Sequence, residues 1–334
     1  MIENSNQIIR EVGQRFLEEH HSDPAVQYVS GQLLLTRGVG KGYDEQFSSG
    51  DPFQVRNLHL ALVIGGSIDN TVNLLPRHLE KGDLLLMTPD SILTQTGRSD
   101  DFDMQVLQLS PDYVADLFRG SVPPVFSHRM RDFILKTSGD IRSVYRSLLD
   151  SLWGLLHAEI CTEAAVDACV MALLQFVREM TLSQMRIQKA EGTHNLVLFN
   201  RFIDLVNEYC DEHREVSYYA DAIGLTKQYL GSVITAASGK TASTWIDEAL
   251  LSRIKILLMH SDLTSAEISE RLSFPAPSHF ARFFKRLTGL TPKEYRKRPS
   301  NDAGHSDDSL AGARLAAGWT SAAAVLTSRS KARE

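Results

Sequence analysis

Basic side chains gather between residues 271 and 298, a segment whose one acidic residue is Glu294. The whole chain is acidic, with a formal net charge of −6, so its composition alone argues against nonspecific nucleic-acid binding. A local basic cluster is instead the electrostatic pattern expected for contacts with DNA phosphates, although any single member could equally lie on a solvated helix face. The cluster consists of Arg271, Arg282, Lys285, Arg286, Lys293, Arg296, Lys297 and Arg298.

Two segments that could position such side chains, 217–241 and 264–298, each predict a short helix, a tight break and a second helix. In the short helices the apolar residues recur at helical spacing: Ala220, Ile223 and Leu225, then Ile268, Leu272 and Phe274. The second helices carry inward stripes of Tyr229, Leu230, Val233 and Ile234, then Phe280, Phe283, Phe284 and Leu287.

The breaks carry residues suited to turns and helix ends. Gly224 fits a positive φ, and Thr226 is a good N-cap for the helix after it. Pro277 is tolerated as a first helical residue, whereas Ala276 before it lacks a capping side chain, a loss of about 1 kcal/mol. The two second helices are predicted to end at Gly239 and Gly289.

The second segment, with Ser-His-Phe-Ala-Arg-Phe-Phe-Lys-Arg followed by Thr-Gly-Leu-Thr-Pro-Lys-Glu-Tyr-Arg, resembles the signature of AraC/XylS-type transcription regulators. The resemblance covers about residues 197–298. It implies an all-α DNA-binding domain with two helix-turn-helix motifs, whose two recognition helices enter successive major grooves on one face of the duplex.

Such grooves lie about 34–36 Å apart, so two reading helices in one chain need a rigid spacer. Residues 241–261 predict one helix, which at about 1.5 Å per residue is roughly 30 Å long. Its broad apolar stripe would connect both units to one core and consists of Trp245, Ile246, Ala249, Leu250, Ile254, Leu257 and Leu258.

The resemblance also implies which side chains face DNA. In the first recognition helix they are Lys227, Gln228, Gly231, Ser232 and Thr235; in the second they are Ser278, His279, Arg282, Lys285 and Arg286. Gly231 and Ser232 depart from the large polar or basic residues of many relatives. A glycine within a helix costs roughly 1 kcal/mol, so Gly231 suggests close backbone approach and limited base reading. Arg282 is the best candidate for bidentate guanine recognition.

Residues 25–120 predict a β-rich domain of short apolar or alternating runs separated by turn residues. The segment 79–114, with Gly82-Asp83-Leu84 and Pro89, resembles the small cupin-like β-barrel that precedes the DNA-binding domain in many of these regulators. The fold class expected is therefore α+β, with this barrel, a helical hairpin and the all-α C-terminal domain.

A cupin raises the alternative of an enzyme, and a catalytic metal site needs at least three N or O ligands. Metal-bearing cupins supply several histidines, but here His59 stands alone and Leu93 occupies the last histidine position. We therefore expect no metal, no cofactor and no catalytic residues. A small apolar cavity with a few polar groups could hold an effector. The weak candidates for effector binding are Arg37, Arg56, His59 and Gln105.

Residues 121–188 predict a helical segment, with helices at about 127–136, 141–160 and 162–187. In the last of these a heptad-like seam runs along one face. Either the seam is only the internal packing of an antiparallel hairpin, or the surplus apolar face of these helices builds a dimer interface, and the resemblance favours a homodimer. Its members are Val166, Val170, Leu173, Val177 and Met180.

No function is assigned to the remaining segments. Residues 1–24 predict a lead-in, the polar residues 189–196 a linker, and residues 299–334 a disordered tail. A membrane-spanning helix needs a run of about 18 apolar residues, and the sequence contains no run of that length. No secretory signal is visible either, so a cytoplasmic location is expected.

The prediction is a DNA-binding transcription regulator, not an enzyme, whose barrel senses a small molecule or mediates assembly. Its expected partners are double-stranded operator or promoter DNA, a small-molecule effector, a second copy of the chain and RNA polymerase. The sequence does not distinguish an activator from a repressor. The alternatives are a cupin enzyme fused to a DNA-binding module, which a metal held by three barrel ligands would favour, and a ligand-independent regulator, which a filled barrel interior would favour.

Overall fold

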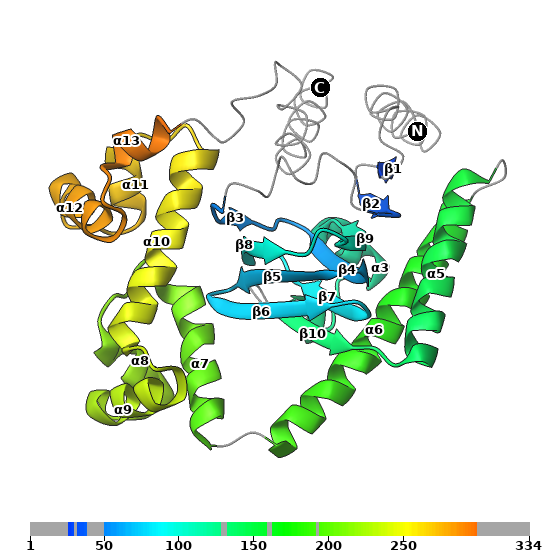
Figure 1. The fold of residues 1–334 in the computed structure, drawn as a ribbon, viewed down its shortest axis with the longest axis horizontal. Helices are drawn as coiled ribbons and strands as arrows, with labels where there is room; N and C mark the ends of the chain where they lie inside the picture. The colour runs from blue at the N-terminus through cyan, green and yellow to red at the C-terminus, as the bar shows by residue number, and fades with distance from the viewer. Residues whose placement is uncertain are drawn as a thin grey trace.

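A computed structural model describes residues 26–29, 32–38, 50–127, 132–158, 162–191 and 194–298. The predicted lead-in and tail lie outside these residues. The described part divides into a β-rich half with two long helices and an all-α half (Figure 1). No helix in the described part is long and apolar enough to cross a membrane.

The β-rich half consists of two antiparallel sheets. One has six strands in the order β1-β2-β9-β4-β7-β10, and the other has four in the order β3-β8-β5-β6. Strand pairing that would close them into the predicted barrel is not seen among the described residues, so we describe a two-sheet sandwich. The strands are β1 (Val26–Val29), β2 (Leu33–Thr36), β3 (Phe53–Gln54), β4 (Leu58–Gly65), β5 (Ser67–Val72), β6 (Leu75–Glu80), β7 (Asp83–Met87), β8 (Ile92–Arg98), β9 (Asp103–Leu109) and β10 (Asp132–Lys136).

Alternation along the strands of the larger sheet produces two cores. In β4, Leu60 and Leu62 face the helices, while Ala61 and Val63 face the smaller sheet. The space between the sheets is filled by packed side chains: Val55, Ala61, Val63, Ile68, Val72, Leu79, Leu85, Met87, Leu93, Phe102 and Val106.

In the described part of the chain, four helices accompany the sandwich: α3 (Pro111–Leu117), α4 (Pro124–Ser127), α5 (Gly139–His157) and α6 (Glu163–Glu191). Val170, Leu173 and Val177 of the predicted seam are fully buried in the core that α5 and α6 share with the sheet. The predicted barrel and helical segments thus form one unit, and these seam residues pack internally.

The helix predicted at 127–136 is wrong, because β10 occupies Asp132–Lys136 and pairs antiparallel with β7. A short apolar run such as Phe-Ile-Leu does not distinguish helix from strand, and an available edge of β7 decides the outcome. The linker predicted at 189–196 is also too long. Helix α6 continues to Glu191 and α7 (His194–Tyr209) begins at His194, because Gln, Lys, Ala and Glu are good helix formers.

The all-α half is built around α10 (Ala242–His260). One core joins its first part to α7, α8 (Val216–Ile223) and α9 (Lys227–Ser238), and another joins its second part to α11 (Ser265–Arg271), α12 (Pro277–Thr288) and α13 (Pro292–Arg296). With 19 residues, α10 is about 28 Å long. Figure 1 shows α9 and α12 near its two ends, on the side away from the sheets.

The predicted breaks and caps are confirmed. Gly224, Gly239 and Gly289 end their helices with φ of 81°, 72° and 76°. The Thr226 side chain accepts a hydrogen bond from the backbone N–H of Tyr229, and Ala276 provides no side-chain cap before Pro277.

The two halves dock through the smaller sheet. Ile92 of β8 packs on Ile256 of α10, and the Asn207 side chain of α7 donates to the backbone oxygen of Asn73 at 3.1 Å. The Tyr295 hydroxyl donates to Asp51 Oδ1 at 2.5 Å, across 244 positions of sequence. Burial lowers the pKa of nearby His260, so a neutral imidazole is favoured at this junction.

A double-mutant cycle of Asp51→Asn and Tyr295→Phe tests this docking. Phenylalanine retains the ring packing against Phe284, 5.2 Å away between centroids, and removes only the hydroxyl. In urea unfolding of the full chain, we expect the loss of unfolding free energy in the double variant to differ from the sum of the two single losses by about 0.5–1.5 kcal/mol. Strictly additive losses would mean that the hydrogen bond does not form in solution.

Candidate nucleic-acid interface

The predicted DNA-facing residues of α9 lie on its outer surface. Lys227, Gln228, Ser232 and Thr235 are exposed, and Gly231 is partly buried. A Cβ added to Gly231 would meet no atom within 4 Å, so the chain's own packing does not require glycine here. Leu230, Val233 and Ile234 are buried and fix the rotation of α9 about its axis.

Tyr229 differs from its predicted inward orientation, since it is 46% exposed. It stands one position before Leu230, about 100° around the helix from it, while Leu230, Val233 and Ile234 fill the space beneath α9.

The predicted residues of α12 are all exposed: Ser278, His279, Arg282, Lys285 and Arg286. Phe280 and Phe284 are fully buried against α10, and this orients the helix. Arg286 already has a partner within the protein, because its guanidinium forms an ion pair with Asp247 of α10 at 3.0 Å. Arg282 and Lys285 make no ion pair within the described part of the chain, and both remain accessible for DNA.

One member of the basic cluster has a structural role that the sequence did not reveal. Arg296 donates to the backbone oxygens of Leu258 and Leu263, at 3.0 and 2.6 Å. It thereby satisfies carbonyl groups at and after the C-terminal end of α10, where a positive charge is favoured by the helix dipole.

The structure does not bring the four effector candidates together. Gln105 pairs in register with Leu62 and so faces the helices, whereas His59 shares the face of Ala61 between the sheets. Arg37 pairs with Asp150 of α5 at 3.3 Å and lies over the Trp153 ring, and Arg56 is exposed. Burial lowers the pKa of His59 to about 4, so the ring is neutral near pH 7.

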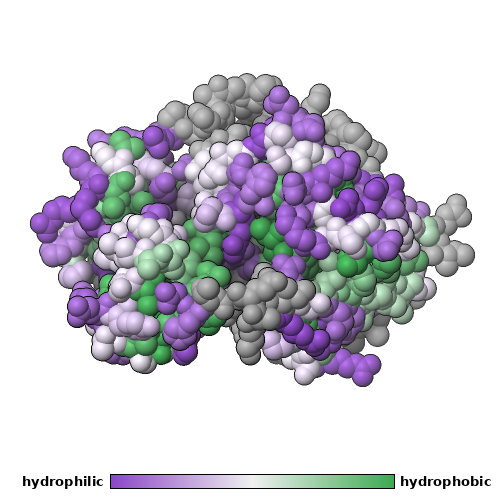
Figure 2. Space-filling view, turned by 60° about the horizontal axis from the view of Figure 1, so that its bottom comes forward, coloured by the Kyte–Doolittle hydropathy of each residue, from purple (hydrophilic) through white to green (hydrophobic). Residues whose placement is uncertain are grey.

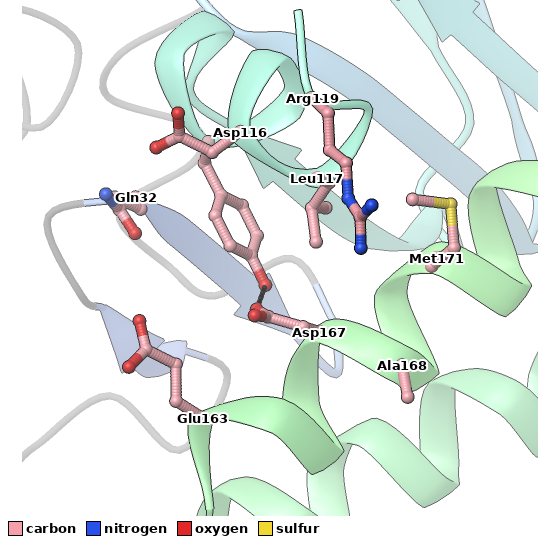
Figure 3. A pocket seen from close by; sticks show the side chains of 9 residues that line it. Gln32, Asp116, Leu117, Arg119, Glu163, Asp167, Ala168 and Met171 are labelled. Carbon is pink, nitrogen blue, oxygen red and sulfur yellow. Dashed lines mark hydrogen bonds between the residues drawn. The ribbon is translucent and has the colours of Figure 1, made fainter.

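No group of three metal-binding side chains occurs within the described ranges. A polar pocket of about 390 Å³ lies outside the sandwich, between α3 and the start of α6 (Figure 3). The Tyr113 hydroxyl donates to Asp167 Oδ1 at 2.6 Å in this pocket, and Arg119 reaches toward the same space. Its charged lining residues are Asp116, Arg119, Glu163 and Asp167.

Residues 219–298 match a family model described as a helix-turn-helix domain, so the class of the all-α half is that of a DNA-binding domain. The expected resemblance is confirmed: this part of the chain is similar to AraC-type helix-turn-helix domains, and the relatives of the chain include transcriptional regulatory proteins.

The relatives are distant. An uncharacterized transcriptional regulatory protein, YesN of Bacillus subtilis, is 26% identical over 214 residues, which are 58% of this chain and 55% of YesN. The chain thus spans about half the length of this relative. An uncharacterized helix-turn-helix regulator of Pseudoalteromonas carrageenovora is 26% identical over 123 residues, 36% of this chain and 72% of that protein. The solved structure of ToxT from Vibrio cholerae covers 79% of this chain and 98% of its own, at 12% identity and a TM-score of 0.35.

Proposed function

We propose that the protein is a sequence-specific transcription regulator in which α8–α9 and α11–α12 are two helix-turn-helix motifs that insert α9 and α12 into successive major grooves. The observation that carries this proposal is the exposure of both helices near opposite ends of one rigid helix, α10. The described length of α10 is of the order of one duplex turn. Because its relatives are bacterial regulators, whose DNA lies in the cytoplasm, we place its action there.

Arg282→Ala tests the assignment of α12. We expect specific binding to weaken by about 1–3 kcal/mol and selectivity to relax at one base position, because the guanidinium would read guanine. The measurement is fluorescence anisotropy with operator DNA obtained by in vitro selection on the full chain, and with that DNA substituted one position at a time.

Lys285→Ala is the matched comparison. If Lys285 contacts phosphate, its loss weakens binding on all sequences alike and lowers the salt slope by about 1. An equal loss on every sequence for Arg282→Ala would assign Arg282 to phosphate contact instead.

For the sandwich we propose a role in assembly, because side chains fill the space between its sheets. Hydrophobic surface remains where α5 and α6 lie (Figure 2), and Val144 and Met185 are 47% and 41% exposed. A homodimer formed through these helices would present two DNA-binding domains to repeated half-sites. Sedimentation equilibrium tests this: a chain that remains monomeric at micromolar concentration contradicts it.

The sensing role is proposed for the polar pocket rather than for the space between the sheets. Its mixed charges suit a small polar effector that would bind at this open surface pocket.

A further inference from the structure

Tyr229 is among the few large apolar side chains exposed within the described residues. It is the third residue of α9, and its backbone N–H donates to Thr226 Oγ1 at 3.2 Å, so its position in the first helical turn is fixed. The N-terminal residues of a recognition helix are those that approach base edges.

The neighbours of Tyr229 leave room for its ring to reach a partner. Ser232 and Ala236, three and seven positions later, share its side of the helix, and both are small and exposed. Ser232 is also one of the residues expected to face DNA, so Tyr229 lies at the border of that surface. Among the expected readers of α9, only Lys227 and Gln228 have long side chains, and both precede Tyr229.

From this placement we infer that Tyr229 is a specificity-determining residue, whose ring packs against the 5-methyl group of a thymine in the major groove read by α9. The thymine methyl is the apolar feature of that groove, and apolar side chains recognise it by contact. The inference deepens the proposed function and rests on it.

The test removes each half of the contact. With operator DNA selected by the full chain, each thymine in the half-site read by α9 is replaced by deoxyuridine, which lacks only the methyl group. For the wild-type protein we expect one replacement to weaken binding about fourfold, the equivalent of about one buried methyl group. The affinity of Tyr229→Ala for the unmodified operator should be about five- to twentyfold lower than that of the wild type, and the affinity of Tyr229→Phe should stay within about twofold of the wild type.

The decisive result is non-additivity: on the Tyr229→Ala protein, the same thymine replacement should have almost no effect. Val197→Ala, which trims a 52% exposed side chain on α7, is the control and should bind like the wild type. Thermal unfolding of each variant verifies that the domain is folded.

Three outcomes overturn the inference: unchanged binding by Tyr229→Ala, additive losses, or a loss in Tyr229→Phe as large as in Tyr229→Ala. The last would place the contact at the hydroxyl group, on a phosphate or a polar base edge. Failure of the proposed function is seen separately, as a wild-type protein that selects no preferred sequence at all.

Discussion

Ser252→Pro should reduce operator binding at least about 100-fold, the largest effect we expect of any single change on DNA binding. Ser252 lies in the middle of α10: the residues packed with α8–α9 end at Ala249, and those packed with α11–α12 begin at Leu250. Proline there removes a helical hydrogen bond and clashes with the preceding turn, at a cost of about 3 kcal/mol or more. The kink would misplace one recognition helix relative to the other. Anisotropy titrations with the selected operator measure the loss.

Two further substitutions at this position separate rigidity from side-chain chemistry. Ser252→Ala removes the hydroxyl that donates to the Glu248 backbone oxygen at 3.0 Å and preserves the helix, so binding should stay within about twofold. Glycine at this position costs about 1 kcal/mol of helix stability relative to alanine, so Ser252→Gly should give a loss of DNA affinity between those of the alanine and proline variants. A proline variant with native circular dichroism and native affinity would show that α10 does not set the spacing.

Phe284→Ala should destabilise the part of the domain that contains α11 and α12 by about 3–5 kcal/mol, because it leaves a cavity at a fully buried position of α12. The ring lies 6.4 Å from that of Phe280 and 5.2 Å from that of Tyr295, between centroids, so one truncation loosens contacts in both α12 and α13. Urea unfolding of the full chain, followed by circular dichroism, measures the loss.

Phe283→Ala is the matched control on the same helix. Phe283 is partly buried and lies at the edge of this core, so its truncation should cost less than half as much. Equal losses for the two variants would mean that α12 packs with a different face from the one described.

Local chemistry made the C-terminal domain predictable from sequence. Gly224, Gly239 and Gly289 stand where a left-handed backbone is needed, and Thr226 and Pro277 mark helix starts. These signals act within a few residues, so they survive any tertiary arrangement. The buried stripes of α9 and α12 follow from the same spacing, although Tyr229 is exposed and Phe283 and Leu287 are only partly buried.

Features that depend on partners distant in sequence were not predictable. The segment Asp132–Lys136 becomes a strand because β7 offers it an edge, and nothing within its own residues specifies that edge. The hydrogen bond between Tyr295 and Asp51 and the contact between Ile92 and Ile256 have no sequence signal, because neither pair belongs to a motif.

The effector candidates show the same limit in a different form. His59 and Gln105 have residue types suited to binding, but their faces depend on strand register. A shift of one position moves a side chain to the opposite side of a sheet, so residue type alone could not place them together.

Hydroxyl-radical footprinting of the full chain on its selected operator tests the central claim most directly. Two recognition helices on one rigid helix predict two protected segments on one face of the duplex, about 10 base pairs apart centre to centre. Protection of a single groove, or of two segments on opposite faces, would contradict the account.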